Sequence, residues 1–387
     1  MNLQARSRAR ISSYPPPSEK ETILTDLFTP MALHGLALPN RIWMSAMTRA
    51  RATADNRPTP LMAEYYARRA TAGLIVTECT AVSEQGKGVI NGPGLWREDQ
   101  IGAWRMVTNA VHAAGGRIFC QLWHCGRVAH PDMRRGVLPV APSPLPAEGK
   151  FKFPDREADF PIPRELSAEE IPAIVADFAA ATRNARGAGF DGVELHAANG
   201  YLHDQFLQDI SNKRTDAWGG AVENRARLIL ETVEAMAGAW SMDRVGVRLG
   251  PSISLYGMGD SDPLTTFGYV VRELDRRRIG CLTMLEPNKK DLEKGVAIEQ
   301  VAKTFRPMTT APFIANTGFD KAKGMNVLRS GDADAIAYGS LYIANPDLVA
   351  RFKADGPLNK PDPHTFYGAG PKGYTDYSTL TANEEAA

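Results

Sequence analysis

Three polar side chains in the segment H-A-A-N-G-Y, residues 196–201, could activate a carbonyl compound. His196 and Asn199 can both donate to one oxygen if a turn brings them together, and Tyr201 then offers a phenolic proton beside that oxygen. Such an arrangement withdraws charge toward the oxygen and supplies a general acid. In the alternative interpretation, His196 only satisfies a backbone carbonyl and Tyr201 is a core aromatic residue.

Two further residues near the ends of apolar runs could bind an anion or a heterocycle. Arg248 lies in the run that begins at Val245, and burial of its charge is costly unless an anionic partner meets it. That partner could be a carboxylate, in a purely structural ion pair, or a flavin whose reduced ring is negative near N1 and O2. Gln121 can offer a donor and an acceptor to the edge of a heterocycle.

Two glycine-containing segments have the form of phosphate-binding loops. Asn316, Thr317 and Gly318 precede a predicted helix at 321, and Gly339 and Ser340 precede another at 345. Backbone N–H groups at helix starts bind phosphate, and TIM barrels often carry such a site at the seventh and eighth loops. Two ordinary glycine turns are the alternative.

These residues belong to short β-rich runs that alternate with helical patterns from Pro39 onward, which indicates repeated βα units. Ser167 followed by Glu170 predicts one helix start. Other helices are predicted near 61–71, 98–113, 222–238, 263–278, 321–330 and 345–353. Eight strands are predicted, at 41–46, 74–79, 117–123, 192–196, 245–249, 281–285, 312–315 and 335–338.

Eight such units predict an α/β fold, a single (β/α)8 TIM barrel whose strand ends converge on one cavity. Residues 126–166 are too long for an ordinary connection, so we expect an excursion after strand 3, with a hairpin, over a mouth of the barrel. An open doubly wound sheet is the alternative fold. The sequence argues against it, because no G-x-G-x-x-G follows the first strand. The expected domains are a disordered extension over 1–22, the barrel over 23–380 and a tail over 381–387.

The composition favours a globular protein that binds small molecules. The 387 residues carry 45 Lys and Arg against 44 Asp and Glu, so no net field favours nucleic acid or an anionic membrane. No apolar run is long enough to span a membrane. The cysteines show no C-x-x-C spacing, so we expect reduced thiols in the cytoplasm and no metal site. They are Cys79, Cys120, Cys125 and Cys281.

A series of ordered motifs resembles the Old Yellow Enzyme family, the FMN-dependent ene-reductases, over most of residues 25–380. The motifs are L-F-T-P at 27–30, P-N-R-I at 39–42, M-A-E-Y-Y-A-R-R-A at 62–70, A-G-L-I-V-T-E at 72–78, Q-L-W-H-C-G-R at 121–127, A-G-F-D-G-V-E-L-H-A-A-N-G-Y-L at 188–202, R-T-D-A-W-G-G-A-V-E-N-R at 214–225, I-A-N-P-D-L-V-A-R-F at 343–352 and G-Y-T-D-Y at 373–377.

The resemblance implies roles for individual residues around FMN. Residues expected at the flavin ring are Ala46, Met47, Thr48, Cys79, Gln121 and Arg248. Residues expected at the FMN phosphate are Asn316, Thr317, Gly318, Gly339 and Ser340. Residues expected at the substrate are Trp123, His196, Asn199 and Tyr367. Tyr201 is expected to donate the proton, so the catalytic set is Tyr201, His196 and Asn199.

The resemblance also implies the reaction. NADPH, or NADH, reduces FMN, and a hydride then passes to the β-carbon of an α,β-unsaturated carbonyl or nitro compound while Tyr201 protonates the α-carbon. Both half-reactions use one site, which implies a ping-pong mechanism. Quinones and nitro compounds are further expected acceptors, and the chain is expected to be a monomer or homodimer.

Two positions depart from the family pattern. Ser340 stands where many relatives carry an arginine that binds the FMN phosphate, and loss of that contact could weaken FMN binding by about 1.5–3 kcal/mol. We expect another cation, Lys321 or Lys323, to compensate. Val89 stands where many relatives have a tyrosine over the pocket, which affects acceptor positioning and size selection.

Two other functions stay open on the sequence alone. A metal-dependent TIM-barrel hydrolase would need H-x-H at the first strand or clustered acidic ligands at strand ends, and the sequence shows neither. A flavin-binding homologue with weak turnover is the other alternative, motivated by Ser340.

Overall fold

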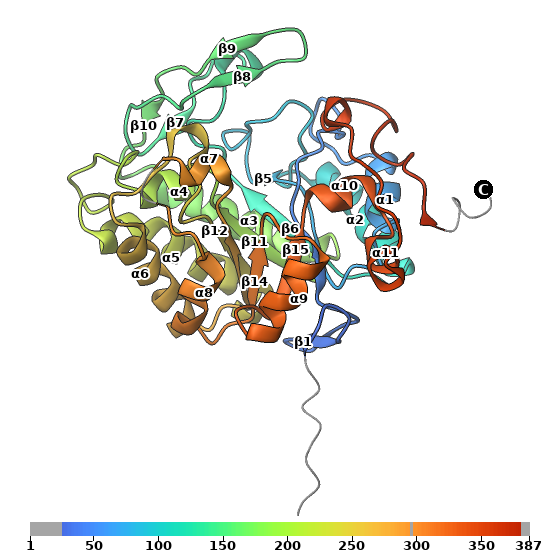
Figure 1. Ribbon diagram of the computed structural model, residues 1–387. Helices are drawn as coiled ribbons and strands as arrows, with labels where there is room; N and C mark the ends of the chain where they lie inside the picture. The colour runs from blue at the N-terminus through green and yellow to red at the C-terminus, as the bar shows by residue number, and fades with distance from the viewer. Residues whose placement is uncertain (1–24, 295–296, 381–387) are drawn as a thin grey trace, which may run out of the picture.

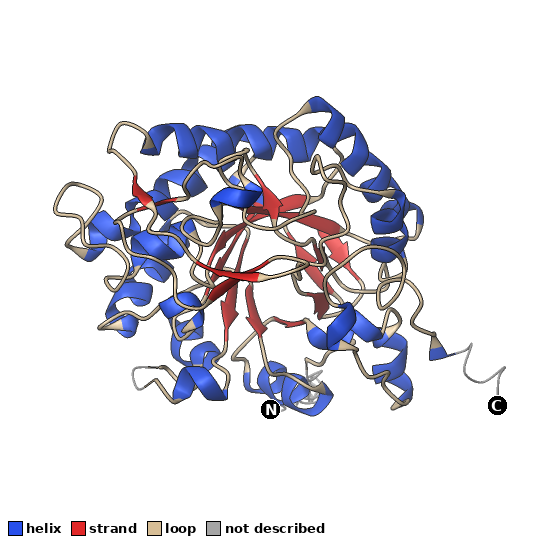
Figure 2. Cartoon of the chain, turned by 90° about the horizontal axis from the view of Figure 1, so that it is seen from above, coloured by secondary structure: helices blue, strands red, loops and turns tan. Residues whose placement is uncertain are grey.

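Parallel strands form a closed barrel at the centre of the protein (Figure 2). The computed structural model describes residues 25–294 and 297–380, so the extension and tail predicted at 1–22 and 381–387 lie outside the described residues. Each strand pairs in parallel with the next, and the last pairs with the first, which confirms the predicted TIM barrel. In barrel order the strands are β3 (Ile42–Met44), β4 (Ile75–Val76), β6 (Ile118–Trp123), β11 (Gly192–Ala197), β12 (Val245–Leu249), β13 (Cys281–Leu285), β14 (Phe313–Asn316) and β15 (Ala335–Tyr338).

Helices surround this barrel on the outside (Figure 2). Asp262 and Asp320 cap two of them, because their carboxylates accept from the N–H groups of Thr265 at 3.1 Å and Lys323 at 2.8 Å. The helices are α1 (Pro60–Ala67), α2 (Glu98–Ala113), α3 (Ile171–Gly187), α4 (Leu202–Leu207), α5 (Val222–Ala239), α6 (Pro263–Arg276), α7 (Lys289–Leu292), α8 (Val301–Phe305), α9 (Lys321–Ser330), α10 (Ser340–Ala344) and α11 (Leu348–Ala354).

The predicted helix at 345–353 is wrong at its start. Ser340 is itself the first residue of α10, and α10 ends before α11 begins at Leu348. Pro346 explains the break, because a proline disfavours helical geometry in the residue before it, and Asn345 accordingly has φ −125° and ψ 84°.

A short hairpin closes the amino-terminal end of the barrel. Strands β1 (Met31–Leu33) and β2 (Leu36–Leu38) pair antiparallel at the bottom of the view in Figure 1. Leu33 and Leu38 pack in one buried cluster with Trp43 of β3 and Phe119 of β6. This end of the barrel is therefore filled by apolar side chains, which leaves the opposite end for a site.

The segment between β6 and α3 lies beyond the barrel at the top of Figure 1. It contains an antiparallel hairpin, β8 (Lys150–Lys152) with β9 (Glu157–Asp159), and a parallel pair, β7 (Val140–Ala141) with β10 (Arg164–Glu165). A further short strand, β5 (Thr80–Ala81), extends the barrel sheet beside β6. The short 3-10 helices are η1 (Pro131–Met133), η2 (Met242–Arg244), η3 (Leu255–Gly257), η4 (Arg306–Met308) and η5 (Pro363–Thr365).

The C-terminal segment returns to the end of the first barrel strand. Arg49, which is fully buried, donates to the carbonyls of Phe366 at 3.0 Å and Gly373 at 2.7 Å. The Tyr374 ring stacks on that of Tyr65, with centroids 3.9 Å apart. The two ends of the barrel sequence are thus joined by hydrogen bonds to a buried cation.

Candidate active site

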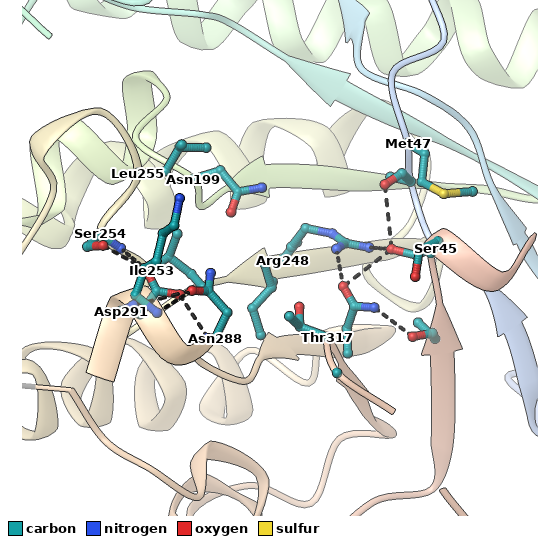
Figure 3. Close-up of a pocket in the computed structure, with 18 of the residues that line it drawn as sticks. Ser45, Met47, Asn199, Arg248, Ile253, Ser254, Leu255, Asn288, Asp291 and Thr317 are labelled. Carbon is teal, nitrogen blue, oxygen red and sulfur yellow. Dashed lines mark hydrogen bonds between the residues drawn. The ribbon is translucent and has the colours of Figure 1, made fainter. Parts of the chain in front are cut away.

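The carboxyl ends of the barrel strands surround a cavity of about 670 Å³, within the usual range of roughly 300–1,000 Å³ for ligand sites. Figure 3 shows Arg248 reaching toward Ser45 on one side of it, with Ser254, Asn288 and Asp291 on the other. The predicted site residues that line it are Ala46, Met47, Asn199, Arg248, Asn316, Thr317, Gly318, Gly339 and Ser340. The other predicted residues are not part of the lining that the described chain provides, namely Thr48, Cys79, Gln121, Trp123, His196, Tyr201 and Tyr367.

Arg248 is held by a buried network at the floor of the site. Its Nε donates to the Glu194 carboxylate at 3.0 Å, and its two terminal nitrogens donate to Asn316 Oδ1 at 2.8 Å and Ser45 Oγ at 3.1 Å. Asn316 in turn donates to the Ala337 carbonyl at 2.6 Å. The carboxylate partner that burial of Arg248 requires is therefore present in the chain itself.

Sequence reasoning missed Glu194 and Ser45. Glu194 lies two residues before His196 in β11, so alternation along the strand turns both side chains toward the same side, and this signal could have found it. Ser45 directly follows β3, where a polar residue is expected to face the site.

The same carboxylate joins Gln121 to Arg248. Gln121 donates from Nε2 to Glu194 Oε1 at 2.7 Å, and its Oε1 accepts from the Cys79 thiol at 3.3 Å. The Thr48 hydroxyl also hydrogen-bonds Cys79, and burial raises the pKa of that thiol to about 12. The thiol therefore stays protonated at neutral pH and acts as a donor.

His196 and Tyr201 meet edge to face beside this network. Their ring centroids lie 4.9 Å apart, and Trp123 packs against the other side of Tyr201 at 5.1 Å. His196 is only 3% exposed, and its Nδ1 has no hydrogen-bond partner among the described residues. Burial, and then the charge of Arg248, lower the pKa of His196 well below its usual value, so the ring is neutral at neutral pH.

The turn that contains Asn199 and Tyr201 is held by hydrogen bonds between Gly200 and two side chains of α4. Asn199 has φ +59° and Gly200 has φ +77°. The Gly200 N–H donates to Asp204 at 2.8 Å, and the Gly200 carbonyl accepts from Gln205 Nε2 at 2.6 Å. Burial raises the pKa of Tyr201 well above its usual value, so its phenol keeps its proton at neutral pH.

The second group of loops follows β14 and β15. Thr317 and Gly318 have φ +81° and +76°, and a positive φ is unusual for a β-branched residue such as Thr317. Strain of this kind concentrates at functional sites. Gly339 directly precedes α10, so Ser340 occupies the first helical position rather than a loop.

The structure does not support the expected compensation by Lys321 or Lys323. The Lys321 ammonium pairs with Asp355 at 2.5 Å, and neither lysine is among the described residues that line the cavity. The lysines that do line it are Lys290 and Lys294, from the segment after β13. Lys290 lies in α7 with Asp291, and Lys294 follows that helix. Figure 3 shows Asn288 and Asp291 across the cavity from Ser45.

Two residues expected at the substrate have different surroundings. Tyr367 is 66% exposed and is not among the described residues that line the cavity. Val89 packs against the buried cluster that includes Cys79, Trp123 and Cys125, as Tyr201 also does.

The donor set suits FMN. A guanidinium has more N–H donors than the three that Glu194, Asn316 and Ser45 accept from Arg248, so donors stay available for a ring edge. Gln121 likewise uses one N–H of its amide within the described network. The glycine-containing loops at 316–318 and 339–340 lie on the same cavity and offer backbone N–H groups for a phosphate.

Residues 25–294 and 297–380 contain neither a candidate metal cluster nor a helix that could span a membrane. They contain no group of three or more His, Cys, Asp or Glu side chains able to hold a metal ion. The same residues form no helix with the length and apolar character needed to cross a membrane.

Comparisons with known proteins agree with the geometry. The flavin oxidoreductase hxnT of Emericella nidulans is 41% identical over 92% of this chain and 97% of its own length. The 12-oxophytodienoate reductase 2 of Arabidopsis thaliana is 40% identical over 92% of this chain and 96% of its own length.

Solved structures match the whole barrel. The old yellow enzyme homologue of Zymomonas mobilis superposes with a TM-score of 0.88 at 41% identity, over 92% of this chain and all of that chain (100%). Morphinone reductase in complex with tetrahydroNAD gives 0.87 at 43% identity, over 92% of this chain and 98% of that chain. These matches confirm the resemblance to the Old Yellow Enzyme family. Since the model of the NADH:flavin oxidoreductase / NADH oxidase family also matches residues 26–359, the chain belongs to that family.

Proposed function

We propose that this protein is an FMN-dependent ene-reductase that reduces the activated C=C bond of α,β-unsaturated carbonyl or nitro compounds with NADPH or NADH. The observation that carries the proposal is the edge-to-face contact of His196 with Tyr201, whose ring centroids lie 4.9 Å apart. His196 is buried with an Nδ1 that has no partner among the described residues, and Tyr201 keeps its phenolic proton. Family membership supplies the flavin chemistry.

The residues that would hold FMN form two sets. Gln121, Arg248 and Thr48 would bind the polar edge of the ring, with Ala46, Met47 and Cys79 beside it. Asn316, Thr317, Gly318, Gly339 and Ser340 would hold the phosphate. When bound, FMN supplies storage for the two electrons that pass from the nicotinamide to the alkene.

His196 and Asn199 bind the oxygen of the substrate as hydrogen-bond donors. A neutral imidazole can donate from only one nitrogen, and the low pKa of His196 keeps it in this form. Donation to the oxygen draws electron density from the β-carbon, which makes that carbon the acceptor of a hydride.

Tyr201 donates the proton that completes the reduction. Its raised pKa keeps the phenol protonated, and the rings of Trp123 and His196 hold it in one orientation. The alkene thus gains one hydride at the β-carbon and one proton at the α-carbon. Trp123 and the exposed Tyr367 shape the pocket for the rest of the substrate. Nitro compounds and quinones, which need less from Tyr201, are further acceptors.

Anaerobic titration tests this proposal. NADPH or NADH should bleach the visible flavin absorption of the purified protein, and cyclohexenone should then restore it. Cyclohexanone, the saturated ketone, is the matched control and should leave the flavin bleached. A protein without flavin absorption, or equal recovery with both ketones, would refute the proposal.

A further inference from the structure

Glu194 is a buried carboxylate that contacts two of the residues assigned to the flavin ring. Glu194 sits in the middle of β11 with a side chain only 2% exposed. Its Oε1 accepts from Gln121 Nε2 at 2.7 Å and from Arg248 Nε at 3.0 Å. Its Oε2 accepts from the Thr283 hydroxyl at 2.9 Å. One side chain thus orients donors from three neighbouring strands, β6, β12 and β13.

These contacts determine both the orientation of the Gln121 and Arg248 side chains and the net charge around them. Free amide and guanidinium side chains rotate, and each bond to Glu194 restricts which N–H groups stay free to face the cavity. The carboxylate also opposes the charge of Arg248 at 3.0 Å, where both side chains are buried. A buried ion pair of this kind is costly to assemble, and removal of one partner leaves the other charge uncompensated.

We propose that Glu194 is a positioning residue for the flavin, which holds Gln121 and Arg248 for the ring edge and sets the net charge there. This inference rests on the proposed function, because it assumes that FMN binds where these residues converge. The reduced form of FMN carries negative charge near N1 and O2. The carboxylate therefore moderates the stabilisation that Arg248 alone would give to this form.

A substitution can remove the charge of Glu194 and keep the shape of its side chain. Glu194→Gln keeps the size of the side chain and keeps an oxygen acceptor for Gln121 and Arg248, while it removes one negative charge. The unopposed guanidinium should then favour the reduced flavin. A unit charge in the protein interior corresponds to at least about tenfold in the ratio of the two dissociation constants of FMN, which is about 30 mV for a two-electron couple.

The experiment measures the midpoint potential of bound FMN and the affinity of the apoprotein for oxidised FMN. We expect Glu194→Gln to raise the potential by at least about 30 mV. Thr283→Val is the matched control, because it deletes a hydrogen bond to the same carboxylate and keeps the charge, so its potential should stay near that of the wild type. A merely structural role would weaken oxidised and reduced FMN alike and leave the potential unchanged, which would overturn the inference.

A second variant covers the case in which Glu194→Gln does not fold. Glu194→Asp keeps the charge but shortens the side chain by one methylene, so it cannot reach both Gln121 and Arg248. It should weaken FMN at least about tenfold with little change in potential, whereas wild-type affinity would overturn the inference. If the wild-type protein itself binds no FMN, the proposed function fails; if it binds FMN and turns over while both variants behave as wild type, only this inference fails.

Discussion

Replacement of Tyr201 by phenylalanine should separate the two half-reactions. The ring of Tyr201 is fixed by Trp123 at 5.1 Å and His196 at 4.9 Å, and phenylalanine preserves both contacts. The change therefore removes the hydroxyl, together with its hydrogen bond to Tyr256, and keeps the ring. In the proposed mechanism the hydroxyl acts when the alkene is protonated, so flavin reduction by NADPH should change less than enone reduction.

The magnitude follows from the loss of a general acid. Such a group contributes about 10²–10⁴-fold, or about 3–5 kcal/mol of transition-state stabilisation. Burial keeps the phenol of the wild type protonated across neutral pH, so the whole effect should appear at pH 7. We expect enone reduction to slow by about 10²–10⁴-fold and flavin reduction to change by less than about threefold, which is within about 0.7 kcal/mol.

Anaerobic stopped-flow measures each half-reaction by the absorption of the flavin. Phenol, which serves as a probe for the oxygen site proposed at His196 and Asn199, should still bind to the Tyr201→Phe variant. Tyr374→Phe is the matched control, because the buried Tyr374 hydroxyl has no hydrogen-bond partner in the described part of the chain and lies outside the cavity lining. Equal slowing of both half-reactions would refute the assignment of the proton donor.

Four other substitutions test the site and its support. Ser340→Arg should tighten FMN about 10- to 150-fold by adding a charged contact to the phosphate, and unchanged affinity in a fluorescence titration would contradict this. Burial raises the pKa of Asp204 to about 7 from 3.8; only the unfolded state ionises between these values, so the free energy of unfolding should fall from about pH 4 to pH 7. Urea denaturation across that range should show this fall in the wild type and not in Asp204→Asn. Gly126→Ala should lower stability by about 2–4 kcal/mol, because Gly126 has φ +60° and a Cβ there would lie 2.2 Å from Gln205 Oε1. Gly102→Ala, in α2 with nothing within 4 Å, should instead stabilise by about 0.5–1 kcal/mol in the same assay.

The barrel could be predicted from sequence because its signals are local. Each buried strand is a short apolar run next to a helical pattern, and the strand expected at 245–249 has those bounds in the structure. The helix expected at 345–353 begins at Leu348 instead, and a separate short helix runs from Ser340 to Ala344, because Pro346 keeps Asn345 out of helical geometry. Local patterns thus identify elements better than they identify their ends.

Individual residues of the site could be predicted from the sequence, but the hydrogen bonds and ion pairs between them could not. Strand-end position pointed to Arg248 and Gln121, yet Ser45 meets Arg248 across 203 residues of sequence. Glu194 was overlooked because a single glutamate within an apolar strand has no partner that the local sequence reveals. Its three partners lie on other strands. The ion pair of Lys321 with Asp355 also depends on a tertiary contact, between residues 34 apart.

The return of the C-terminal segment to Arg49 has a consequence for biosynthesis. The carbonyl acceptors of this buried guanidinium, at Phe366 and Gly373, leave the ribosome more than three hundred residues after Arg49 itself. The nascent barrel therefore lacks these two acceptors of a buried cation until residues 366–373 have been synthesised. A message that stops before codon 366 would yield eight strands without these acceptors for Arg49, and such a product is an expected substrate for proteolysis.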